Sequence, residues 1–304
     1  MKILSIGCLS LMAACVCASC AHTELPEEDN VSGQQTSQGF KTISFSPFFL
    51  EVTEGSFGDI ANWRSAGAAA SRAGSLSELA TTLSYWDYVG VELIQSNTIE
   101  TSAPLEMKLP YGSHNIYFLA HSSTAESSGG DSFTFVPEKV TETFWTDYPL
   151  TVDNETDGRQ TISLERVVSK AQITVKDAIP SGVSRMRMTV GSHYRTLDLN
   201  TGDATGQPHP YSLSWDLGSE YEGRAGLYFY IFTFTPTAEE EFDTSLKIEA
   251  LSSEDEVLFS MEADGIPLLR NRCTNATCRL FSSGTSFNFT DPGDWTPEQE
   301  LDLK

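Results

Sequence analysis

The feature that most constrains the fold is a long succession of short apolar runs, each of strand length, that begins near residue 85. Polar turns such as Pro110–Gly112 and Ser127–Gly130 separate these runs, as is typical of reversals between strands. Strands this short, joined by polar turns, favour antiparallel sandwiches over a parallel sheet with crossover helices. We therefore predict an all-β protein. The expected strands are Tyr85–Ile94, Leu105–Leu109, Asn115–Ala120, Phe133–Val136, Thr161–Leu164, Ala171–Val175, Met186–Val190, Thr196–Leu199, Leu213–Leu217, Leu227–Thr235, Leu246–Ala250, Val257–Met261 and Ser286–Phe289.

Two of the runs carry further information. Thr42–Phe49 alternates apolar and polar residues, so it is expected to be a strand with Ile43, Phe45 and Phe48 facing a core. Leu227–Phe234 (LYFYIFTF) is apolar on both faces. This pattern predicts a central strand that is covered on both sides.

The segment between these first strands has a different composition. Residues 53–75 are rich in Gly, Ala and Ser, which predicts a mobile loop. Ser75 and Glu78 then have the spacing of a capping box, so a short helix through Leu83 is expected.

Length and charge limit the domain count and the class of partner. The chain has 304 residues, which suggests two domains, and we place them at residues 41–157 and 158–295, with the polar turn Val152–Gly158 as the hinge and 296–304 as a polar tail. Asp and Glu number 42 against 19 Lys and Arg, for a net charge of −23. This acidity argues against nucleic acid as a partner and against direct binding to anionic lipid head groups.

The N-terminus has the pattern of an export signal. Residues 1–19 contain one charge, Lys2, then an apolar stretch that is too short to span a bilayer, then small residues. Cys20 follows Ala18-Ser19, as in the lipobox of bacterial lipoproteins, and Cys15 follows a similar pair and is the alternative. We predict lipidation at Cys20 followed by a flexible tether over 20–40; an ordinary secretory signal remains the other interpretation.

The rest of the sequence has little that indicates chemistry. Cys273 and Cys278 are the only cysteines outside the first 20 residues. A hairpin disulfide between them is our first expectation for an oxidising compartment, with metal binding or two free thiols as alternatives. Residues 153–158 begin like a calcium loop, but Glu165 lies one residue past the closing position, so we interpret them as an acidic turn. No nucleophile, phosphate or histidine-metal motif occurs, and we expect no enzyme activity, no metal and no cofactor.

Four stretches, in this order, resemble motifs of the fimbrillin superfamily of Bacteroidetes, the subunits and anchor or accessory lipoproteins of type V pili. They are Leu109–His121 (LPYGSHNIYFLAH), Ile162–Val175 (ISLERVVSKAQITV), Leu197–Gly202 (LDLNTG), and Ile266–Arg272 (IPLLRNR) with Cys278–Phe281 (CRLF). In the last motif Cys278 stands where the family usually has Gly.

This resemblance covers about residues 41–295 and implies two tandem transthyretin-like antiparallel β-sandwich domains. It also implies a surface lipoprotein of the outer membrane that anchors a fimbria or is assembled into one by donating strands to other fimbrial subunits. In this family an arginine-specific protease releases the first strand of stalk subunits. Arg72-Ala73 is the candidate cut site here, Arg64-Ser65 a lesser one, and Thr42–Phe49 the strand that would be released. In an anchor or accessory subunit the strand and the lipid stay attached.

Adhesion to a host or bacterial surface ligand is also implied by the resemblance. The alternative function is a surface glycan-binding lipoprotein with tandem β-sandwich domains. That function would need an exposed aromatic platform, for which the tryptophans are the candidates: Trp63, Trp86, Trp145, Trp215 and Trp295.

Overall fold

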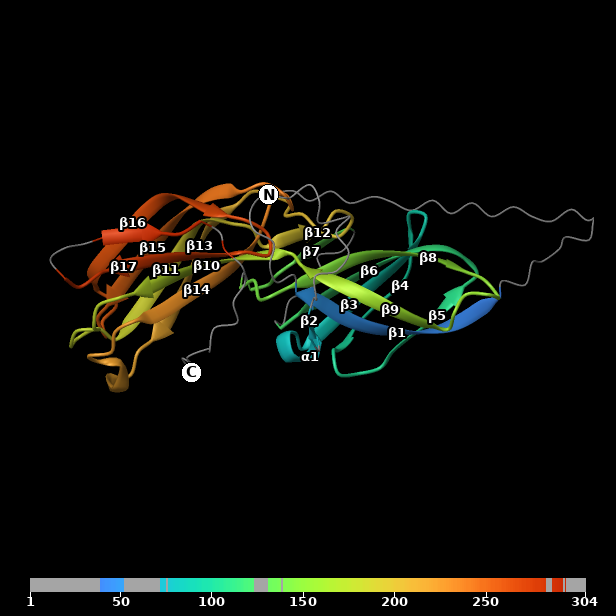
Figure 1. Ribbon diagram of the computed structural model, residues 1–304, viewed down its shortest axis with the longest axis horizontal. Helices are drawn as coiled ribbons and strands as arrows, with labels where there is room; N and C mark the ends of the chain where they lie inside the picture. The colour runs from blue at the N-terminus through green and yellow to red at the C-terminus, as the bar shows by residue number, and fades with distance from the viewer. Residues whose placement is uncertain are drawn as a thin grey trace, which may run out of the picture. The chain divides into compact units, whose positions relative to one another are not determined.

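The computed structural model describes residues 39–51, 72–74, 76–122, 131–137, 139–282, 286–291 and 293. The expected all-β class is confirmed, because these residues form eighteen strands, one four-residue helix and one turn of 3₁₀ helix (Figure 1). No helix among the described residues is long and apolar enough to cross a membrane. The predicted signal, both candidate lipidation sites and most of the tether lie outside this part of the chain.

The elements are β1 (Phe40–Glu51), β2 (Arg72–Gly74), α1 (Leu76–Leu79), β3 (Thr82–Val89), β4 (Glu92–Glu100), β5 (Leu105–Pro110), β6 (Gly112–His121), β7 (Ser132–Thr134), β8 (Phe144–Val152), β9 (Arg159–Arg166), β10 (Val168–Val175), β11 (Arg185–His193), β12 (Thr196–Asp198), β13 (His209–Asp216), η1 (Ser219–Tyr221), β14 (Leu227–Phe234), β15 (Phe242–Leu251), β16 (Val257–Leu268), β17 (Cys273–Arg279) and β18 (Ser286–Phe289).

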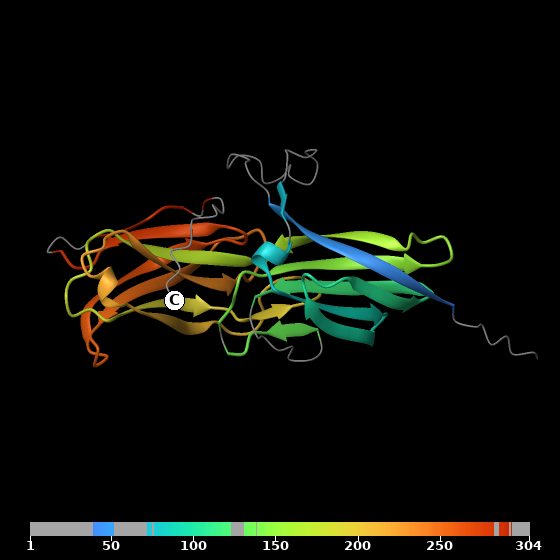
Figure 2. The ribbon, with the colours of Figure 1, turned by 90° about the horizontal axis from the view of Figure 1, so that it is seen from below.

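The first half of the chain forms an eight-stranded sheet that bends around its own core. Its order is β2-β1-β9-β8-β6-β3-β4, and β5 pairs with β1. β8 and β9 share only two register pairs, Phe144 with Arg166 and Trp145 with Glu165, so the sheet turns a corner there. Buried residues from β1, β5 and β9 consequently pack against residues from β3, β6 and β8. In Figure 2, β1 (blue) crosses the strands drawn in green.

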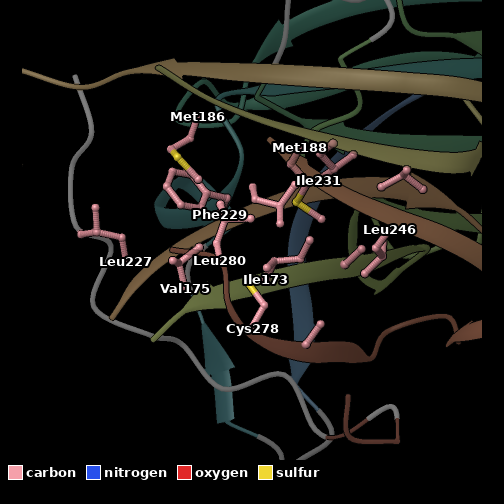
Figure 3. Close-up of a cluster of buried hydrophobic side chains, with 14 of the residues drawn as sticks. Ile173, Val175, Met186, Met188, Leu227, Phe229, Ile231, Leu246, Cys278 and Leu280 are labelled. Carbon is pink, nitrogen blue, oxygen red and sulfur yellow. The ribbon is translucent and has the colours of Figure 1, made fainter. Parts of the chain in front are cut away.

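The second half contains two four-stranded sheets, β14-β10-β17-β18 and β13-β11-β15-β16. Alternate side chains of the facing strands are buried between them, for example Ile173 of β10, Met188 of β11 and Phe229 of β14 (Figure 3). This alternation of buried and exposed positions is what two sheets packed face to face require.

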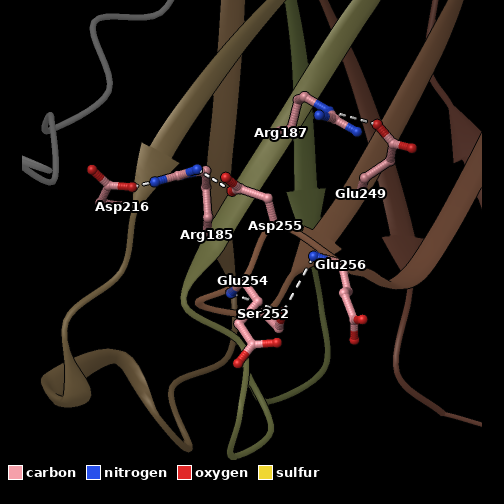
Figure 4. A network of polar contacts seen from close by, with 8 residues as sticks. All are labelled: Arg185, Arg187, Asp216, Glu249, Ser252, Glu254, Asp255 and Glu256. Carbon is pink, nitrogen blue, oxygen red and sulfur yellow. Dashed lines mark hydrogen bonds and ion pairs between the residues drawn. The ribbon is translucent and has the colours of Figure 1, made fainter.

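The outer face of β11 and β15 is polar and held by ion pairs. The Arg185 guanidinium lies between Asp216 and Asp255, and Arg187 Nε donates to Glu249 Oε2 at 2.8 Å (Figure 4). Burial raises the pKa of Glu249, but the hydrogen bonds from Arg187 and Lys247 outweigh it, so the pKa lies below the ordinary value. One face of this sheet therefore packs in the core and the other is charged.

A third buried cluster combines residues from both halves of the chain. Phe133 of β7 pairs in register with Leu197 of β12, although 64 residues separate them. The Phe135 ring lies 5.7 Å from the ring of Phe234, between centroids. The cluster also includes Trp86 and Leu119, which lie on the face of the first sheet that points away from the core containing β1.

The structure corrects several strand predictions. Leu227–Phe234 is β14, an edge strand and not a central one: Leu227, Phe229 and Ile231 are buried, and the intervening aromatic side chains are half-buried. The other face of the strand is also apolar. On this face the rings of Tyr228 and Tyr230 stack on each other along the strand, with their centroids 6.4 Å apart.

Other differences are local. The expected strand Tyr85–Ile94 is a hairpin of β3 and β4 that reverses at Gly90, whose φ of +62° suits glycine. Helix α1 is present but ends at Leu79, before the expected end at Leu83. β8 was not predicted, because its sequence FWTDYPLTV includes Pro149 and a charge.

Candidate functional site

β1 is bonded along both edges. On one side it pairs antiparallel with β5, from Phe40–Pro110 to Phe45–Leu105. On the other it pairs parallel with β9, from Ser44–Arg159 to Phe49–Leu164. The first half of β1 pairs with β5 and the second half with β9, and the two pairings overlap at Ser44 and Phe45. Loss of β1 would therefore leave an unpaired edge on each of these two strands.

The side chains of β1 enter the core of the first half. Ile43, Phe45 and Phe49 are buried, so Phe49 occupies the place that we expected for Phe48. The Phe45 ring lies 5.5 Å from Phe118 and the Phe49 ring 5.4 Å from Phe144, between centroids. Alternate side chains of β1 thus pack against aromatic side chains of β6 and β8 in the core.

Polar contacts hold the beginning of β1. Lys41 Nζ donates to the carbonyl of Asn154 at 2.9 Å, and the Tyr111 hydroxyl donates to Asn154 Oδ1 at 2.5 Å. A Cβ on Gly39 would lie 2.3 Å from Tyr111 Cε2, so a larger residue at this position would require the exposed Tyr111 ring to move. The turn that carries Asn154 is the acidic turn that begins like a calcium loop.

In that turn the Asp153 carboxylate accepts hydrogen bonds from within the chain. The Thr156 hydroxyl and the backbone N–H groups of Thr156 and Glu155 donate to Asp153 Oδ1, each at 2.8 Å. These bonds, with the Thr156 side chain first, lower the pKa of Asp153. The carboxylate oxygen that would have begun a calcium loop is engaged by backbone and hydroxyl donors.

The end of β1 pairs with the segment that carries the candidate processing site. Phe49, Leu50 and Glu51 pair antiparallel with Gly74, Ala73 and Arg72 of β2. The expected loop therefore ends in a short strand, and the Arg72–Ala73 bond lies within it. Residues 52–71, which include Arg64, lie outside the described residues.

Two of the motifs that carry the family resemblance meet in space. Arg166, from the second motif, is buried and donates from Nη1 to Asn271 Oδ1 of the fourth motif at 2.7 Å. Arg166 also contacts Glu142, with Nη2 and Oε1 2.6 Å apart, and the Phe144 ring. The Asn271 N–H in turn donates to Val168 O at 2.9 Å. The motif residues therefore join β9 and β10 to the β16–β17 turn.

The two cysteines of the body do not form the expected hairpin disulfide. Both lie on β17, where Cys273 pairs with Lys170 and Cys278 with Val175 of β10, and both are buried, with no disulfide between them. Five residues of extended chain separate their Cα atoms by about 16 Å, far more than the roughly 4.4–6.8 Å that a disulfide spans. Burial, and secondarily the nearby Asp177 carboxylate, raises the pKa of Cys278 to about 12.

The described tryptophans do not form a platform. Trp86 is buried in the third cluster and Trp215 packs against the core of the second half. Trp145 is half-buried, donating from Nε1 to Leu199 O at 3.1 Å. Trp63 and Trp295 lie outside the described residues.

A buried polar pair was missed by sequence reasoning. His114 Nδ1 lies 2.7 Å from Asp87 Oδ1, and His114 Nε2 lies 2.9 Å from Pro110 O. Both side chains are fully buried. No local sequence pattern indicates the pair, because Asp87 and His114 are 27 residues apart, on β3 and β6. Its position beside the β5–β6 turn gives it a structural role near the start of β1.

Among the described residues no group of three or more His, Cys, Asp or Glu side chains is placed to hold a metal ion. The feature that stands out among the described residues is β1, which pairs with β5 on one edge and with β9 on the other.

No family model and no curated protein match this sequence. Among solved structures, the chain is similar to a candidate cell adhesion protein from Bacteroides ovatus, with a TM-score of 0.50 and 12% identity over 86% of this chain and 100% of that one. It is also similar to a candidate adhesin from Bacteroides ovatus, with a TM-score of 0.49 and 10% identity over 75% of this chain and 84% of that one. A further match is the fimbrial anchor protein Mfa2 from Porphyromonas gingivalis, with a TM-score of 0.39 and 12% identity over 78% of this chain and 91% of that one. The first of these structures shares the fold of this chain over its whole length, so the all-β fold that the motif resemblance implies is found in a solved protein.

Proposed function

We infer that this chain is a fimbrillin-like structural and adhesion lipoprotein of the cell surface, a pilus subunit or an anchor or accessory protein, and not an enzyme. The observation that carries this proposal is the position of β1: a strand from the N-terminus that is bonded on both edges and fills a core with alternate side chains. A strand of this kind can be exchanged for an equivalent strand of a neighbouring subunit, which is assembly by β-strand addition.

The energetics of β1 make such an exchange necessary once the strand is removed. Ile43, Phe45 and Phe49 are each at least nine-tenths buried, and burial of each such side chain contributes about 1.5–3 kcal/mol. Loss of all three would remove about 5–9 kcal/mol, which is comparable with the whole stability of a domain. A groove of this depth, with two unpaired edges, would favour a donor strand with the same alternation.

The proposal allows two forms of the protein, one cleaved after Arg72 and one uncleaved. Cleavage of the Arg72–Ala73 bond would leave β1 held only by hydrogen bonds and packing, as a polymerised stalk subunit requires. Without cleavage, β1 and a lipid on Cys20 stay attached, as an outer-membrane anchor or accessory subunit requires. Adhesion to a surface ligand belongs to the same proposal, because the similar Bacteroides ovatus structure is that of a candidate cell adhesion protein.

The native N-terminus and strand exchange test this proposal. Mass spectrometry of the protein from membranes and from sheared surface material is expected to find either a lipidated Cys20 or a start at Ala73. Palmitate labelling of Cys20→Ala, with Cys15→Ala as the matched control, locates the anchor. Equal labelling of Cys20→Ala and wild type contradicts the anchor position.

After cleavage with an arginine-specific protease, a labelled peptide of residues 40–51 is expected to enter the groove, and the same peptide with Ile43→Asp is expected to stay out. An Arg72→Ala variant, with Arg64→Ala as control, shows whether the cut at Arg72 is required. If neither peptide binds, or both bind equally, assembly through the β1 groove is wrong.

A further inference from the structure

β4 is an open strand edge. It is the last strand of its sheet and, among the described residues, pairs with β3 alone. Its nine residues extend over about 30 Å. Seven of the nine are exposed. The other two are half-buried: Gln95 donates from Nε2 to Lys108 O of β5 at 3.4 Å, and Ile99 packs against the first core. One row of its backbone N–H and C=O groups faces away from β3, and within the strand the Thr98 N–H donates to Asn97 Oδ1 at 2.9 Å.

Side-chain hydrogen bonds to β3 hold β4 in place. The Ser84 and Thr98 hydroxyls lie 2.9 Å apart, and Gln95 Nε2 donates to Asp87 Oδ2 at 3.2 Å. Just past the strand, the Thr101 N–H donates to Thr81 O at 3.0 Å. An incoming strand would consequently meet a row of groups that is already aligned, with little conformational entropy left to lose.

Natural edges are usually protected by lysine, proline or a covering loop. β4 has the sequence ELIQSNTIE, without lysine or proline. At its start, apolar side chains gather on the β3–β4 hairpin: Val89, Val91, Leu93 and Ile94 are all exposed, Val91 almost completely, at 99%. The edge thus combines unpaired backbone with apolar side chains that a partner could cover.

Charge decides which partner fits. Glu92 and Glu100 lie at the two ends of the strand. Antiparallel pairing of two copies centred on Ser96 would place Glu92 opposite Glu100 at both ends, and like charges in opposed positions are destabilising. The rest of the chain adds to this repulsion, because its net charge is −23. We propose that β4 is a docking edge for an extended segment of another protein, one that carries a basic residue at each end and small or apolar residues between.

This docking edge is separate from the β1 groove. β4 lies at the opposite end of the sheet order from β2, and it pairs with β3 and not with β1. Failure of strand exchange at β1 therefore leaves the β4 proposal standing, and the reverse is also true.

Two capped nine-residue peptides test the proposal on the full chain. One has the sequence KTVTVTVTK, and the matched control ETVTVTVTE differs only at its ends. Hydrogen exchange followed by mass spectrometry is expected to show that the lysine-ended peptide slows exchange within residues 92–100. A Glu92→Lys, Glu100→Lys variant is expected to bind it about fivefold more weakly, which is what two exposed ion pairs contribute, and to prefer the glutamate-ended peptide.

A folding defect in the variant could weaken binding of both peptides, but it would not make the variant prefer the glutamate-ended peptide over the lysine-ended one. The proposal is overturned if neither peptide slows exchange in residues 92–100, if protection appears at another edge, or if the double variant binds both peptides as wild type does. It is also overturned if concentrated protein without peptide shows protection of the same residues, because the partner would then be a second copy of this chain.

Discussion

The packing of Ile43 gives the sharpest test of the role of β1. Its side chain has an exposed fraction of 0%, in the core shared by β1, β6 and β9. Ile43→Ala removes three carbon atoms, worth about 2.4 kcal/mol at about 0.8 kcal/mol each. The cavity left behind raises the expected loss of unfolding free energy to about 2–5 kcal/mol.

A matched control is available on β4, because Ile94 is also a strand isoleucine and is 40% exposed. Ile94→Ala makes the same chemical change where little packing is lost, so we expect a cost of about 1 kcal/mol or less. The assay is urea unfolding followed by circular dichroism. With a slope of about 1–3 kcal/mol per M, a loss of about 3 kcal/mol lowers the midpoint by about 1–3 M.

The comparison of the two variants is decisive. If Ile43→Ala and Ile94→Ala lower the midpoint by the same amount, β1 is not a core strand and removing it would leave no apolar groove. The argument that a donor strand must replace β1 would then have no energetic basis.

The remaining predictions concern buried groups in the second half. Burial, and secondarily repulsion by His209, lowers the pKa of His193 from 6.5 to about 3, so below pH 6.5 only the unfolded chain binds the proton. The unfolding free energy should therefore fall by about 2 kcal/mol between pH 6.5 and 5, and His193→Phe should remove this dependence of the urea midpoint on pH. Burial raises the pKa of Asp177, but backbone N–H bonds led by Phe281 outweigh it and lower the pKa overall. Asp177→Ala should lower the unfolding free energy by about 2–3 kcal/mol at pH 7. Wild type loses this contribution when the carboxylate is protonated, so the difference between variant and wild type in thermal unfolding should shrink as the pH falls below the ordinary aspartate range. Cys278, with a pKa of about 12, should resist iodoacetamide at pH 8 until the chain unfolds; rapid alkylation of the native protein, seen by mass spectrometry, would contradict its burial.

Most strand positions could be predicted because the signal for a half-buried strand is local. The alternation in Thr42–Phe49 and Met186–Val190 reports which residues face a core, whatever the neighbouring strand is. The same signal fails where both faces are apolar. β14 has the composition of a central strand, but it is an edge strand whose outer aromatic side chains pack against one another.

The candidate site was predicted in part. The alternation of Thr42–Phe49 and the family resemblance pointed to β1 as the strand to be exchanged, but they did not show that β1 is bonded on both edges. The hairpin disulfide was expected because Cys273 and Cys278 are close in sequence. It is not formed because β17 is extended between them. The open edge of β4 has no sequence signature, since pairing on one side or on two leaves the same side-chain pattern.

The sequence alone determined the β class, the positions of most strands and the residues that must be buried, because these depend on the period of side chains along a short segment. The tertiary structure decided which strands are neighbours: β1 between β5 and β9, Arg166 against Asn271, and β4 with one edge free. The physical reason is that backbone groups pair in the same way whatever the residue, so the choice of partner is made by long-range packing of the cores and not by any local pattern.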